Sequence, residues 1–150
     1  MKLLFSCLTL IALVCTCSLT KTTANNALTE LKQNELTLVY KSHTRGYFEE
    51  ISICETSLIL FNDHKKLNPI RKTISKKEWS KCKSLAAQIE LKSIDKLTAP
   101  SNLRYTDRVA YAQLMVIQEG DSLKSSGFDH KNPPLELKFL VEHILSLKEN

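Results

Sequence analysis

The chain has 150 residues, 43% of them hydrophobic, and a formal net charge of +5 at pH 7. This length and composition allow one domain with one hydrophobic core. The positive charge is too small and too dispersed to indicate a nucleic-acid-binding protein.

The first 24 residues have the pattern of a secretory signal peptide. After Met1-Lys2 the chain runs from Leu3 to Thr20 without a charged residue, and segment 8–14 is largely apolar. A short positive start, an apolar stretch and small polar residues are typical of such signals. Thr22-Thr23-Ala24 places small side chains where a signal peptidase reads the chain. We therefore predict cleavage before Asn25.

Two other fates of this segment remain open. Cys17 could be acylated to give a lipoprotein, although Thr16 is a poor residue before a lipidated cysteine. An uncleaved anchor is the other option, because the 18 uncharged residues approach the roughly 20 that span a bilayer. Cleavage before Asn25 would remove Lys2 and Lys21 and no acid, which lowers the net charge to +3. We expect an exported protein that is periplasmic, outer-membrane-associated or secreted, and that touches the membrane only through a lipid anchor if one is attached.

Cys54 and Cys82 are the cysteines that remain after this cleavage. In an exported protein, a disulfide between them would stabilise the fold by roughly 3 kcal/mol. Two buried free thiols, one in a strand and one on a helix, are the alternative. Both remain open, because the sequence does not give the Cα separation that a disulfide requires.

The mature chain begins with a polar segment, 25–34, which is expected to be a flexible tether. Ser75 and Glu78 have the spacing of a capping box, so we predict a helix that runs to about Glu90 and packs Trp79 onto a sheet. Between the tether and this helix, alternation of apolar and polar side chains and the positions of turn residues predict four strands, at 35–41, 47–55, 57–61 and 70–74.

The segment from Arg108 to His130 is the centre of the predicted fold. Its first arm is apolar on both faces, which indicates an interior strand, and Gly120 supplies the positive φ of a tight hairpin turn. Asn132-Pro133-Pro134 then starts a last helix with an apolar stripe. The order of four strands, helix, two strands and helix predicts a single α+β domain over 35–148. Its mostly antiparallel sheet would carry both helices on one face.

The densest polar cluster flanks this hairpin. Because a hairpin brings the start of one arm beside the end of the other, these side chains should share one edge of the sheet. As a binding site, the cluster would use its arginines for a carboxylate or phosphate, its tyrosine as a flat contact and its histidine as a switchable donor. As a structural feature, it would be a salt-bridged strand end. The residues are Arg104, Tyr105, Asp107, Arg108, Asp129 and His130.

A second candidate patch is the turn at Arg45-Gly46, followed by Tyr47 and Phe48. An exposed arginine and aromatics at a turn are typical of an interaction tip, although Phe48 could equally be a core residue.

The sequence contains no recognised catalytic, phosphate-binding or metal-binding motif. The alternative to a binding protein is a small hydrolase-like enzyme or an enzyme inhibitor, with His130 as general base and Asp129 as its orienter. The four histidines lack the mutual spacing of metal ligands, and we expect no metal or cofactor. The partner would be a protein or another component of the cell envelope, and the oligomeric state is left open.

Three short motifs carry a resemblance to known proteins. They are Thr44-Arg45-Gly46-Tyr47 after a first strand, Ile74 to Trp79 at a helix start, and Phe128 to Pro134 before a last helix. Together with the exported start, they make the chain resemble small uncharacterised envelope proteins or lipoproteins of Gram-negative bacteria. The resemblance covers most of residues 35–147. It implies an envelope location and this fold, and no activity.

Overall fold

The structure is a computed structural model that describes residues 35–106 and 108–149. The expected signal peptide, the tether, Cys17 and Asp107 lie outside the described residues.

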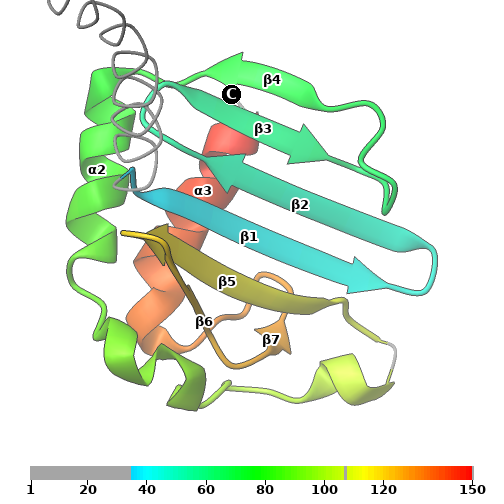
Figure 1. Cartoon of the computed structure of the whole chain (residues 1–150). Helices are drawn as coiled ribbons and strands as arrows, with labels where there is room; N and C mark the ends of the chain where they lie inside the picture. The colour runs from blue at the N-terminus through cyan, green and yellow to red at the C-terminus, as the bar shows by residue number, and fades with distance from the viewer. Residues whose placement is uncertain (1–34, 107, 150) are drawn as a thin grey trace, which may run out of the picture.

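Seven strands form one antiparallel sheet, and both helices lie on the same face of it (Figure 1). The predicted α+β class is confirmed. The sheet order is β4-β3-β2-β1-β5-β6, and β7 also pairs with β5. The strands are β1 (Thr37–Thr44), β2 (Tyr47–Ile53), β3 (Ser57–Phe61), β4 (Ile70–Thr73), β5 (Tyr111–Gln118), β6 (Asp121–Lys124) and β7 (Phe128–Asp129).

Alternation along the strands places the core between the sheet and the helices. On β1, Leu38 and Tyr40 are fully buried, and they pair with Val116 and Leu114 on β5. On the other side of β1 they pair with two further buried residues of β2. Because side chains alternate between the two faces of a strand, these pairs form one continuous apolar layer that the helices cover.

The central hairpin differs in detail from the prediction. Its first arm begins at Tyr111 instead of Arg108, and its second arm is divided into β6 and β7. The division occurs at buried Ser125, whose hydroxyl oxygen accepts a hydrogen bond from the Leu114 amide at 3.1 Å. A side chain thus takes the place of a backbone carbonyl in the ladder. The turn is formed as predicted, with positive φ at Glu119 and Gly120.

The predicted capping box is present at the start of α2 (Lys76–Ala86), where Ser75 and Glu78 bond each other's backbone amides. The helix ends at Ala86, before the predicted Glu90, because the last amides form tighter turns and bring Ile89 into the core. Trp79 is buried, as predicted.

The other helices are short 3-10 helices and the C-terminal helix. The 3-10 helices are η1 (Leu91–Lys96), η2 (Leu103–Thr106) and η3 (Leu135–Leu137), and the last leads directly into α3 (Lys138–Glu149). Among residues 35–106 and 108–149, no helix combines the length and apolar character that a bilayer crossing requires.

Candidate binding site at the hairpin end of the sheet

The two sequence patches lie at the same end of the sheet. His43 on β1 pairs with Tyr111 on β5, which in turn pairs with Asp129 on β7. The β1–β2 turn and η2 therefore lie at the same end of the sheet, as Figure 1 shows. The rings of Tyr47 and His130 meet edge to face, with their centroids 5.9 Å apart. Tyr47 and His130 thus connect the two patches at this end of the sheet, and we call the side chains of both patches the hairpin-end surface: Arg45, Tyr47, Tyr105, Arg108 and His130.

The Asp129 carboxylate is the anchor of this end. It accepts hydrogen bonds from the Ser101 hydroxyl at 2.6 Å and from the backbone amides of Leu103 and Arg104 at 2.8 and 2.9 Å. Its fourth partner is the Arg104 guanidinium, at 3.1 Å. The side chains of Asp129 and Arg104 are 2% and 6% exposed. A salt bridge therefore forms at this strand end, as expected if the cluster is a structural feature. Its carboxylate fixes η2 to β7.

These hydrogen bonds also determine the ionisation of Asp129. Burial by itself would raise the pKa of the carboxyl group, but the donors from Ser101, Arg104 and Leu103 outweigh this and lower the pKa to about 2. Asp129 is therefore an ionised carboxylate at any physiological pH. It neutralises the Arg104 guanidinium, so Arg104 does not require an anionic ligand.

Arg104 in turn positions Tyr105. The guanidinium carbon lies 4.4 Å from the centroid of the Tyr105 ring, and Nη2 donates to the phenol oxygen at 3.3 Å. The Tyr105 side chain is nevertheless 74% exposed. A large aromatic group is thus held in solvent by a buried cation.

His130 is oriented by Tyr40. Its Nδ1 lies 2.8 Å from the Tyr40 hydroxyl. Burial raises the pKa of Tyr40, so its hydroxyl stays protonated, and the tautomer of His130 decides whether this hydroxyl donates to Nδ1 or accepts from it. Burial also lowers the pKa of His130, which favours the neutral ring.

This geometry bears directly on the hydrolase-like alternative. That alternative needs Asp129 to orient His130, but the carboxylate oxygens of Asp129 point to residues 101–104 and the ring nitrogen Nδ1 of His130 bonds to Tyr40. The base and its expected orienter are therefore not brought together.

The sequence did not predict a buried ion pair between β2 and α3, two residues after Tyr47. Glu49, on the helix-covered face of β2, is 5% exposed, and its Oε2 lies 2.7 Å from Nζ of Lys148 on α3. Its Oε1 is buried without a hydrogen-bond partner among the described residues. The available signal was the alternation of Tyr47, Glu49, Ile51 and Ile53, which puts an acid on the apolar face of the strand.

Cys54 and Cys82 are both free thiols, so they form no disulfide in this structure. Cys82 is buried on α2, and burial raises its pKa to about 11. Cys54 follows β2, and its sulfur lies 3.3 Å from the Ser57 hydroxyl. In the part of the chain that the structure describes, no three His, Cys, Asp or Glu side chains group together as a metal site would require.

A comparison with protein-family models finds no family that matches this chain, and a comparison with curated proteins finds no matching relative.

Proposed function

We propose that this protein is an exported, non-catalytic binding protein whose hairpin-end surface engages a protein of the cell envelope. The observation that carries the proposal is the contact between Tyr47 and His130, which joins the two sequence patches into one surface.

The composition of the surface supports a protein partner. Tyrosine and arginine are enriched in protein–protein interfaces, where they supply much of the binding energy. Arg45 and Arg108 are exposed, and neither is within salt-bridge distance of an acid among the described residues. Tyr105 is already held in place by Arg104, so binding would cost little conformational entropy of this side chain. The partner should present acidic groups beside an apolar or aromatic patch.

Photo-crosslinking in the cells that produce the protein tests the proposal. A photoreactive amino acid replaces Tyr105 on the hairpin-end surface, and in a second variant it replaces Lys77, which is exposed on α2. We expect a crosslinked adduct from position 105 and none of the same mass from position 77. Arg45→Ala combined with Arg108→Ala should abolish the adduct from position 105, because it removes the charges that face the partner.

The double substitution changes exposed side chains, so its melting temperature should match that of the parent within about 2 °C. An adduct that persists in the folded double variant would show that this surface does not select the partner. Equal adducts from both positions would show non-specific capture and would also contradict the proposal.

The export part of the proposal rests on residues 1–24 and has its own test. The intact mass of the protein from its own cells should correspond to a chain that begins at Asn25, or to one acylated at Cys17. A mass that includes Met1 to Ala24 would contradict export with cleavage.

A further inference from the structure

Two large apolar side chains stand in solvent at the start of the C-terminal helix. Leu135 on η3 is 77% exposed, and Phe139 on α3 is 66% exposed. They are four residues apart on nearly continuous helical backbone, so they share one face. The opposite face is the core stripe of Leu137, Leu140, Val141, Ile144 and Leu147. Leu135 and Phe139 therefore belong to an outward ridge that the sheet does not use.

Two shallow grooves adjoin this ridge. The larger, about 520 Å³, lies between loop 97–100 and residues 131–138, and Leu135 is on its wall. The smaller, about 300 Å³, lies between α2 and α3, with Phe139 and Leu85 on its walls. Four lysines and two glutamates line the two grooves. We call the ridge together with these charged residues the helix face. It consists of Leu135, Phe139, Lys81, Lys96, Lys131, Lys138, Glu136 and Glu142.

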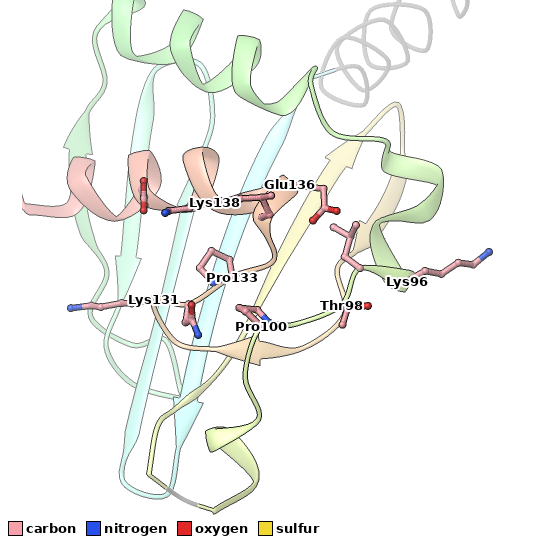
Figure 2. A pocket seen from close by; sticks show the side chains of 11 residues that line it. Lys96, Thr98, Pro100, Lys131, Pro133, Glu136 and Lys138 are labelled. Atoms are coloured by element: carbon pink, nitrogen blue, oxygen red, sulfur yellow. The ribbon is translucent and has the colours of Figure 1, made fainter.

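The lysines of the larger groove do not converge. Figure 2 shows Lys96 and Lys131 extending to opposite sides of the groove, away from its centre, while Lys138 runs along the helix. A single small anion inside the groove would need ammonium groups that point toward it. Amines spread around an apolar ridge are suited instead to an extended anionic surface.

We propose that the helix face docks onto an anionic lipid bilayer, with Leu135 and Phe139 inserted among the acyl chains and the lysines placed at the headgroups. Exposed Phe and Leu flanked by lysines share one feature with helices that lie in a membrane interface, namely apolar side chains that can enter the acyl region beside cations at the headgroups. The cations here are all lysines, which are depleted from protein interfaces. Long apolar stems let their charges remain at headgroup level. This surface shares no residue with the hairpin-end surface, although Lys131 follows His130 directly in the chain, and the proposal does not depend on the function proposed for the latter.

The two glutamates provide a gain-of-function test. Glu136 and Glu142 lie among the lysines and must weaken attraction to anionic lipid. Each change of a lysine to glutamine should weaken partitioning into such vesicles about fivefold. Glu136→Gln should strengthen it by a similar factor, because it removes a like charge from the surface.

The experiment places a fluorescent reporter on the ridge, in the protein as its cells process it. Phe139→Trp carries the reporter, and Leu67→Trp is the matched control, because Leu67 is 69% exposed on the β3–β4 loop. The native Trp79 is buried and contributes the same background to both. Each variant is mixed with vesicles of brominated phosphatidylcholine, with or without an equal amount of phosphatidylglycerol. Bromine quenches only a tryptophan that enters the bilayer, so the readout reports this position and no other membrane-binding segment.

We expect quenching and a blue shift of the residue-139 reporter with the anionic vesicles, much less with phosphatidylcholine alone, and neither effect at residue 67. Lys138→Gln in the reporter protein should shift the lipid titration to about fivefold higher concentration. Absence of quenching at residue 139, equal quenching at both positions, or quenching independent of phosphatidylglycerol would each overturn the proposal. A blue shift that needs no lipid and grows with protein concentration would show that a second copy of the chain covers the ridge, and would overturn it too.

Discussion

Replacing Asp129 by asparagine should sharply destabilise the fold. The substitution keeps the size of the side chain but removes the charge that faces the Arg104 guanidinium, whose side chain is 6% exposed. It also turns an amide group toward donors that now bond to a carboxylate, among them the Leu103 amide and the Ser101 hydroxyl. Removing one partner of a buried ion pair costs about 3–5 kcal/mol. This is a large share of the ~5–15 kcal/mol that stabilises a typical domain.

Urea unfolding and thermal unfolding, both followed by circular dichroism, measure this loss. For a domain of this size, we expect the free energy of unfolding to fall by about 3–5 kcal/mol and the melting temperature by about 10–20 °C. Arg45→Ala is the control, because it removes an exposed arginine and should change the free energy of unfolding by no more than ~0.5 kcal/mol. Arg104→Met combined with Asp129→Asn should lose less stability than Asp129→Asn alone, because no unpaired charge is left buried. If the free energy of unfolding of Asp129→Asn lies within about 1 kcal/mol of the parent value, the carboxylate does not hold η2 against β7 as described.

Three further predictions concern acid, the core and the thiols. The pKa of Asp129 in the folded protein, about 2, lies below the value near 3.8 that is expected in the unfolded chain. The ionised carboxylate therefore contributes about 2 kcal/mol to the free energy of unfolding, and this contribution is complete above pH 4 and is lost as the pH falls toward 2. An acid-unfolding curve that Asp129→Asn leaves unchanged would contradict this. Trp79→Ala removes a large buried side chain and should cost about 3–5 kcal/mol, so an unchanged melting temperature would show that α2 does not dock on the sheet. An alkylating reagent near pH 8 should modify Cys54 well before Cys82, whose buried thiol has a pKa of about 11, and peptide mapping that finds equal rates would refute the packing of Cys82.

The sequence predicted most of the elements because their signals are local. The capping box needs only Ser75 and Glu78 at the right spacing, and the turn at Gly120 needs only one residue that tolerates positive φ. The strands were recognisable from alternation along short segments, and the order of strands and helices predicted that both helices would lie on one face. The extent of the elements was predicted less well. The early end of α2 and the break between β6 and β7 depend on Ile89 and Ser125, whose environments come from distant parts of the chain.

For the candidate site, the sequence determined which residue types lie near the ends of the central hairpin, and that two patches contain exposed arginine and tyrosine. Only the tertiary structure decided their roles. Arg104 and Asp129 are 25 residues apart and became a buried pair because η2 packs against β7. Tyr40 is 90 residues from His130 and orients its ring through a hydrogen bond. Such partnerships depend on how strands pair across the sheet, and sheet pairing is a long-range property that no local pattern of side chains encodes.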